Sequence, residues 1–214
     1  VLASAGVAEF VFERIPHIED EIAYVWQARV IAAGRLTIPT PPHPKSFLVP
    51  FVVEYNGQRF GKYPLGWTAV LAIGERLGGR FLVNPLLAGL GVWLTFLLGK
   101  RAFNDKIALL AAGLTLTSPF FLMNSGTLLS HPLGLVLSSL FALAWLDAFG
   151  TRSTLPRWLS TLTAAFALGG LALTRPFTAV AVAIPFALHG LVLFARGDRR
   201  IRIHLIALGL VAGA

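Results

Sequence analysis

The stretch that decides the fold is residues 177–195, FTAVAVAIPFALHGLVLFA, which contains no acidic or basic residue. Arg175 stands just before it and Arg196 follows it. An uncharged apolar run of this length is typical of a helix that crosses a lipid bilayer, for which about 17–25 residues are needed. The stretch therefore predicts a membrane-spanning helix with a cation near each end.

Four further apolar runs alternate with short charged connectors, at 83–99, 107–123, 131–149 and 158–174. The whole sequence is 56% hydrophobic and 13% charged, whereas a soluble domain has about a quarter of its residues charged. This pattern predicts an all-α integral membrane protein, a multi-span helical bundle, and it excludes a soluble globular domain.

The two ends of the sequence are apolar as well. We interpret 1–13 as the end of a first span and 203–214 as the start of a further span, so that the sequence forms a single membrane module. A cleavable signal peptide at the start is the weaker alternative, because Glu9 and Glu13 stand where a basic start and a small-residue cleavage site are expected. Cysteine is absent, which excludes disulfides and thiolate metal sites.

The connectors predict an orientation. Those at 99–106, 150–157 (with Arg152) and 196–202 are basic, and short basic loops face the cytoplasm. The other connectors and the long segment 14–82 are therefore expected on the outer face of the cell (plasma) membrane, which the chain crosses several times. The basic loops also account for the net charge of +8, so nucleic acid is not an expected partner.

The outer segment 14–82 is too long for a simple connector, and its first part predicts a helix. Residues 20–33 place apolar side chains at three-to-four spacing after an acidic first turn, and Gly34 follows. We expect an amphipathic helix that lies along the membrane surface. The prolines that follow, at 39, 41, 42 and 44, predict an extended segment.

The second part of the outer segment predicts a hairpin and another helix. Asn56-Gly57 between two apolar-leaning runs is a strong hairpin signal. A short interfacial helix should then begin near Pro64 and end at Gly78-Gly79.

Unusual polar residues are predicted to gather at the outer ends of the helices, and they are Asp20, Glu21, Lys62, His131 and Arg175. Each has an ordinary structural explanation: acids complement a helix N-terminus, and cations or histidine lie at the headgroups. The functional alternative is a carboxylate that acts as a general base and cations that recognise phosphate. Residues of these types at one membrane face favour a site there.

Two short motifs, in this order, resemble a known family. Residues 20–24, DEIAY, open the outer segment, and residues 57–67, GQRFGKYPLGW, come later in it. The pair resembles bacterial members of the GT-C membrane glycosyltransferases, related to the protein O-mannosyltransferases and the lipid A aminoarabinose transferase. The resemblance implies a GT-C-like bundle of which this sequence is the N-terminal part.

The resemblance also implies a function. The chain would move a hexosyl or pentosyl group from a polyprenyl-phosphate carrier to a lipid, glycan or protein acceptor on the non-cytoplasmic face. Asp20 would be the catalytic carboxylate, and Glu21 would support it or bind the acceptor. The residues expected to bind substrate or phosphate are Lys62, Tyr63, Arg175, His131 and Tyr24.

Two positions depart from the family pattern. Pro64-Leu65 replaces a pair of prolines, and Ser130-His131 replaces an acidic residue at the start of a later span. No metal ligand is therefore carried over, and the sequence gives a divalent metal cofactor no support.

Two other functions stay open. A transporter or flippase of a lipid-linked or anionic solute would use the same cations, although the apolar runs carry few polar residues at mid-membrane. An assembly subunit of a membrane complex would need neither Asp20 nor Lys62.

Overall fold

The structure is a computed structural model that describes residues 1–150 and 155–213. Arg152, one of the cations behind the predicted orientation, and Ala214 lie outside the described residues. The chain forms two compact units. The first unit comprises residues 1–90 and 115–133, and the second comprises 91–114 and 134–214.

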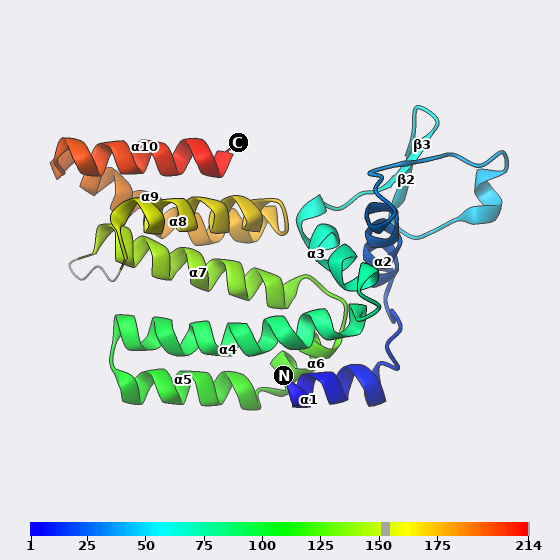
Figure 1. The fold of residues 1–214 in the computed structure, drawn as a ribbon, viewed down its shortest axis with the longest axis horizontal. Helices are drawn as coiled ribbons and strands as arrows, with labels where there is room; N and C mark the ends of the chain where they lie inside the picture. Colours follow the sequence, from blue (N-terminus) through cyan, green and yellow to red (C-terminus); the bar gives the residue numbers. More distant parts are fainter. Residues whose placement is uncertain (151–154, 214) are drawn as a thin grey trace. The chain divides into compact units, whose positions relative to one another are not determined.

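Helices make up most of the described chain (Figure 1). They are α1 (Leu2–Gly6), α2 (Glu19–Ala32), α3 (Leu65–Arg76), α4 (Val83–Ala102), α5 (Asp105–Thr117), α6 (Pro119–Gly126), α7 (His131–Phe149), α8 (Arg157–Ala172), α9 (Pro176–Arg196) and α10 (Arg199–Gly213). A π-helical turn at Val7–Val11 continues α1, and short 3-10 helices lie at Pro44–Phe47 and Arg80–Leu82.

Three helical segments of the described chain are long and apolar enough to cross a membrane: Arg80–Ala102, His131–Phe149 and Pro176–Arg196. Each contains one of the runs predicted as a span. On α9 the side chain of Phe177 is 92% exposed, which suits a surface solvated by lipid. The prediction of an all-α membrane bundle is confirmed.

The predicted run 107–123 is not one helix. It is divided into α5 and α6, whose axes differ by 59°. Pro119 lacks the N–H group that a continuous helix requires, and the Oγ of Ser118 caps the new helix by accepting from the backbone N–H of Phe121 at 3.3 Å. Both signals were present in the sequence.

The core of the second unit is formed by α7, α8, α9 and α10 (Figure 1). Phe141 and Trp145 of α7 pack on alanines of α8 in a buried cluster. Small residues allow such helices to approach closely. The 16 residues of α8 reach about 24 Å at about 1.5 Å per residue, less than the about 30 Å of a bilayer core. Full crossings at 158–174 and 203–214 stay predictions.

The outer segment carries the predicted hairpin. β2 (Val52–Tyr55) pairs antiparallel with β3 (Gln58–Gly61). Asn56 and Gly57 both have positive φ, 49° and 71°, as a two-residue hairpin turn requires. Sequence reasoning missed a third strand, β1 (Ile38–Pro39), which pairs with the other edge of β3.

The proline-rich segment is extended only in part. Pro39 lies in β1, as expected of an extended residue. Pro44 instead begins the 3-10 helix Pro44–Phe47, because the fixed φ of proline also suits the first turn of a helix.

In the first unit α2 packs against α3, and an ion network links them. Glu75 of α3 accepts from the Nε of Arg29 on α2 at 3.0 Å and from Nη1 of Arg80 at 2.7 Å. Partial burial acts to raise the pKa of Glu75, but the hydrogen bond from Arg29 and the charge of Arg80 outweigh it, so that the pKa lies below its ordinary value.

This network predicts a pH-dependent contribution to stability. A lowered folded-state pKa gives stability that is present above the ordinary value of 4.5 and is lost as the pH falls through the folded value. We expect Glu75→Gln to cost roughly 1–2 kcal/mol at neutral pH, discounted for the exposure of Arg29. Thermal unfolding of the detergent-purified protein at a series of pH values checks this.

The difference in stability between the wild type and Glu75→Gln should become smaller as the pH falls below 4.5. Glu13→Gln, at an exposed residue without an ion pair among the described residues, is the control. A gap that stays constant down the pH series would contradict the assignment.

Candidate active site

Asp20 and Tyr63 form the centre of the candidate site. The chain is extended at Ile18 and then begins α2, so Asp20 lies in the first turn of this helix. Its side chain is half-buried. Its carboxylate accepts a hydrogen bond from the Tyr63 hydroxyl, which comes from the segment between β3 and α3. The DEIAY and GQRFGKYPLGW motifs therefore meet at this bond.

Aromatic rings surround Tyr63. The Tyr24 ring, one turn after Asp20 on α2, lies 4.8 Å from the Tyr63 ring, and Phe51 meets Tyr63 edge-on at 5.8 Å. The ammonium of Lys62 lies 3.3 Å from the centre of the Phe51 ring and 5.0 Å from that of Tyr63. We call Asp20, Tyr24, Phe51, Lys62 and Tyr63 the Tyr63 cluster.

The Tyr63 cluster presents a protonated hydroxyl, that of Tyr63, and a cation, the ammonium of Lys62. Burial, followed by the hydrogen bond to Asp20, raises the pKa of Tyr63, so its hydroxyl stays protonated and donates to the carboxylate. Lys62 is exposed and has no acidic partner among the described residues. Its ammonium rests on an aromatic face, where the attraction is weaker than an ion pair, and can still bind an anion.

Gln27 holds the segment that carries Lys62 and Tyr63. This residue lies two turns after Asp20 on the same face of α2, and it is 1% exposed. Its Oε1 accepts from the backbone N–H of Gly61 at 2.7 Å, and its Nε2 donates to the carbonyl of Leu36 at 2.9 Å. A Cβ at Gly61 would lie only 3.3 Å from the Cβ of Gln27, so the approach is close.

Sequence reasoning missed Gln27 and Phe51. The register of the hairpin could have revealed Phe51, because Val52 pairs with Gly61 and the next position opposite Phe51 is Lys62. The Lys62 N–H indeed donates to the Phe51 carbonyl at 3.0 Å. No comparable signal marked Gln27, whose partners are 9 and 34 residues away.

Glu21 has a different environment from Asp20. Its side chain is 1% exposed, and its two carboxylate oxygens accept from the backbone N–H groups of His17 and Leu128, both at 2.7 Å. The carbonyl of Leu128 in turn accepts from the indole of Trp67 at 2.9 Å. Glu21 therefore fixes the start of α2 to the chain before α7, which is a positioning contact.

The two remaining predicted residues lie elsewhere. His131 is the first residue of α7, with an exposed side chain, in the first unit. Arg175 precedes α9 in the second unit, where its Nε donates to Thr178 at 3.2 Å. Its stem passes against Gly134 of α7, where a Cβ would lie 3.0 Å from the Arg175 Cδ.

The residues that the structure describes contain no metal-binding cluster. Among the described residues no group of three or more histidine, aspartate, glutamate or cysteine side chains is placed to hold a metal ion.

The fold and the cluster define a helical membrane protein with an acid and a cation brought together after its first apolar helix. Residues 65–214 match the model of the dolichyl-phosphate-mannose-protein mannosyltransferase family, and the chain belongs to that family. It is a glycosyltransferase of the GT-C type, as the resemblance implied, which favours this function over the transporter and assembly alternatives. No curated protein and no solved structure matches the chain.

The family match covers some of the predicted site residues and not others. His131 and Arg175 lie within the matched residues. The match begins at Leu65, so every residue of the Tyr63 cluster lies before it in the sequence. The roles of the cluster residues therefore rest on their geometry and on the two motifs.

Because the Glu21 carboxylate accepts two hydrogen bonds from the backbone, we expect Glu21→Gln to be less stable than the wild type. An amide offers one oxygen and one NH2 group, so one buried backbone N–H loses its acceptor, at a cost of roughly 1–3 kcal/mol. Thermal unfolding measures this against Glu19→Gln, which changes a neighbouring exposed carboxylate in the same turn. Equal stability of the two variants would show that Glu21 does not anchor α2.

Proposed function

We propose that the protein transfers a sugar from a polyprenyl-phosphate carrier to an acceptor hydroxyl at the non-cytoplasmic face of the plasma membrane. The observation that carries the proposal is the Tyr63 cluster: a half-buried carboxylate bonded to the Tyr63 hydroxyl, and an exposed ammonium on the Phe51 and Tyr63 rings that has no acidic partner among the described residues. Membership of the mannosyltransferase family supports it, because the family's description specifies a mannose carried on dolichyl phosphate and a protein acceptor.

Asp20 is the general base of this proposal. The acceptor oxygen attacks the anomeric carbon of the sugar, and its proton passes to the Asp20 carboxylate. The bond from that carbon to the phosphate oxygen breaks, and its electron pair leaves with the carrier phosphate. A positioned base of this kind contributes about 10²–10⁴-fold to the rate. The Tyr63 hydroxyl orients the carboxylate.

Lys62 stabilises the leaving phosphate. Negative charge grows on the carrier phosphate as the bond breaks, and a cation already in place lowers the energy of that state. The Phe51 ring keeps the ammonium near Tyr63 without neutralising it. Tyr63 is half-buried and is the tyrosine that we propose contacts the sugar, whereas Tyr24 is 8% exposed and supports the Tyr63 ring. Phosphate binding by Arg175 and His131 stays a prediction from the sequence.

Glu21 has a positioning role in this proposal. Its bonds to His17 and Leu128 set the first turn of α2, on which Asp20 stands one residue earlier. The turn that carries Asp20 is thus held in place by the hydrogen bonds of the next residue, Glu21.

The role of Asp20 is tested by Asp20→Asn. Asparagine still accepts the hydrogen bond from Tyr63 but takes no proton, so sugar transfer should fall by about 10²–10⁴-fold with insertion and folding unchanged. The measurement is transfer of labelled sugar from a panel of polyprenyl-phosphate donors in membranes that contain the protein. Glu19→Gln, an exposed acid next in the chain, should keep wild-type activity. Activity of Asp20→Asn close to wild type would rule Asp20 out.

The role of Lys62 is tested by Lys62→Met and Lys62→Arg. Methionine keeps much of the apolar stem and removes the charge, so transfer should drop by roughly 10–100-fold, as expected for one charge-assisted phosphate contact. Arginine should restore part of the activity. Lys45→Met removes an exposed charge outside the cluster and should have no effect. If Lys62→Met and Lys45→Met behave alike, Lys62 does not bind the donor.

A further inference from the structure

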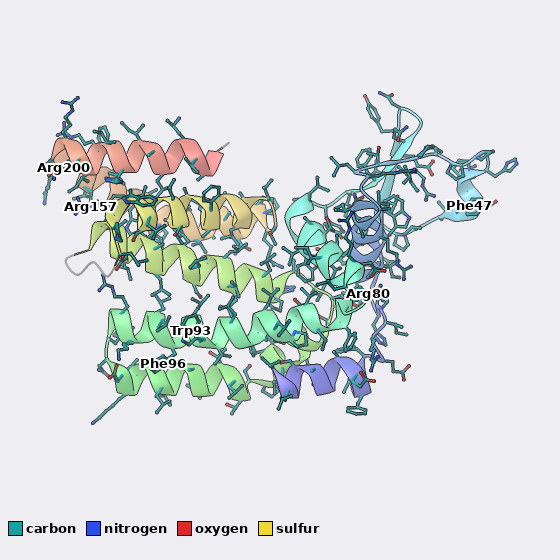
Figure 2. All side chains as sticks on the ribbon, viewed as in Figure 1. Phe47, Arg80, Trp93, Phe96, Arg157 and Arg200 are labelled. Atoms are coloured by element: carbon teal, nitrogen blue, oxygen red, sulfur yellow. The ribbon has the colours of Figure 1, made fainter. Side chains whose placement is uncertain are left out.

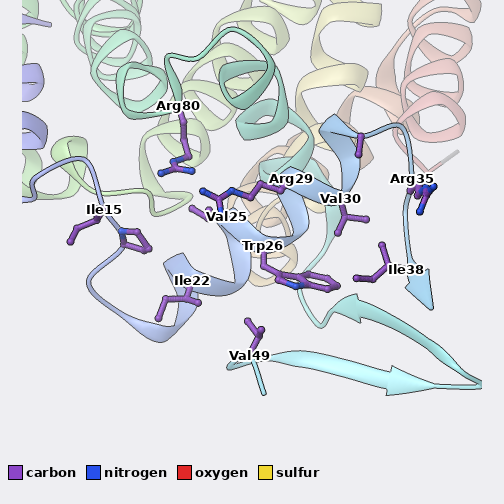
Figure 3. A pocket seen from close by; sticks show the side chains of 12 residues that line it. Ile15, Ile22, Val25, Trp26, Arg29, Val30, Arg35, Ile38, Val49 and Arg80 are labelled. Atoms are coloured by element: carbon purple, nitrogen blue, oxygen red, sulfur yellow. The ribbon is translucent and has the colours of Figure 1, made fainter. Parts of the chain in front are cut away.

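The face of α2 opposite Asp20 lines a groove with a volume of about 560 Å³ (Figure 3). Residues of a helix are rotated by about 100° from one to the next, so Ile22, Trp26 and Arg29 point away from Asp20. The groove is within the size range of ligand sites, about 300–1,000 Å³. Ile38 and Val49 come to it from outside the helix.

The groove is lined mainly by apolar side chains, with Arg29 and Arg80 together at one end and Arg35 apart from them. Figure 3 shows the guanidinium groups of Arg29 and Arg80 beside each other, with Ile22, Trp26 and Val49 along the remaining wall. Both arginines also line an adjoining hollow of about 320 Å³, together with Arg14.

The cations of this region outnumber its acids. The arginines are Arg14, Arg29, Arg35 and Arg80. The carboxylates bonded to them are Glu75, which is shared by Arg29 and Arg80, and Glu9, which pairs with Arg14. At the end of the groove where Arg29 and Arg80 meet, two cations share one carboxylate, and this positive balance complements a ligand with an apolar chain and an anionic head.

The sequence positions of Arg14 and Arg80 indicate their depth relative to the membrane. Arg80 is the first residue of the candidate span Arg80–Ala102, and Arg14 follows the apolar helix Leu2–Val11. Cations at the ends of apolar helices lie at the level of lipid headgroups. Nearby, Ile15 is 50% exposed and Ile18 47% exposed, and such side chains favour contact with acyl chains over contact with water.

We propose that this groove binds one anionic phospholipid of the surrounding membrane. Its phosphate pairs with the guanidinium groups of Arg29 and Arg80, and one acyl chain lies along Ile22, Trp26 and Val49. The site is separate from the Tyr63 cluster, because it uses the opposite face of α2. It goes beyond the proposed sugar transfer and is tested without measuring transfer.

The test uses the protein in phosphatidylcholine nanodiscs that contain phosphatidylglycerol with a photoreactive acyl chain. After irradiation, mass spectrometry identifies the labelled peptides. We expect adducts in the segments around Ile22–Trp26 and Val49. Unlabelled phosphatidylglycerol should suppress these adducts, whereas additional phosphatidylcholine should not. A photoreactive phosphatidylcholine should label these segments only weakly.

The decisive variant is Arg29→Gln/Glu75→Gln/Arg80→Gln. It removes both cations together with the carboxylate between them, so that no half-buried acid is left unpaired, and adduct yield should fall about tenfold or more. Its net charge changes by the same amount as in Lys45→Gln, which is the matched control and should label like wild type. Val49→Trp fills the groove with all the arginines kept, and it should lose the adducts as well.

Three results would overturn the proposal. One is equal labelling of the groove by the phosphatidylcholine probe. Another is wild-type labelling in Val49→Trp, or in a folded triple variant. The third is displacement by a polyprenyl phosphate but not by phosphatidylglycerol, which would assign the groove to the sugar carrier.

Discussion

The buried amide of Gln27 is the interaction on which the arrangement of the first unit depends. It satisfies its own donor and acceptor with the backbone of Leu36 and Gly61, so that the two sides of the sheet-bearing connector are fixed to α2. A buried polar group is stable only when it is paired, and a pairing this far apart in sequence specifies one arrangement. The bond between Asp20 and Tyr63 follows from it, because Gly61 brings Tyr63 back to the same face of α2.

Each face of α2 has a different task. Asp20, Tyr24 and Gln27 face the connector, and Glu21 faces the chain before α7. Ile22, Trp26 and Arg29 line the groove. The sequence predicts an amphipathic helix that lies along the membrane surface, but the buried residues of α2 include both apolar side chains and the polar Glu21 and Gln27, which have backbone partners. α2 thus buries two polar side chains that are paired with backbone groups, while Ile22 and Trp26 line an open groove.

Local sequence was sufficient where local chemistry decides the structure. The composition of 177–195 predicted a helix that suits lipid, and Asn56-Gly57 predicted a turn that needs positive φ at both positions. The resemblance of two motifs to a known family brought Asp20, Tyr24, Lys62 and Tyr63 into one hypothesis, and in the structure these residues form one cluster of contacts. Long-range pairing could not be predicted from local sequence. Asp20 and Glu21 are adjacent and chemically alike, but Asp20 pairs with Tyr63, 43 residues away, and Glu21 with Leu128, 107 residues away.

The two anchors that flank Lys62 have a mechanical consequence. Gly61 is held by Gln27 and Tyr63 by Asp20, so the backbone of the single residue between them is clamped at both ends to one helix. The base of the hairpin takes part in this clamp, because Phe51, just before β2, accepts from the Lys62 N–H and its ring lies against the Lys62 ammonium. The tip at Asn56-Gly57 lies beyond these contacts, so we expect it to tolerate a change in length while the ammonium keeps its position.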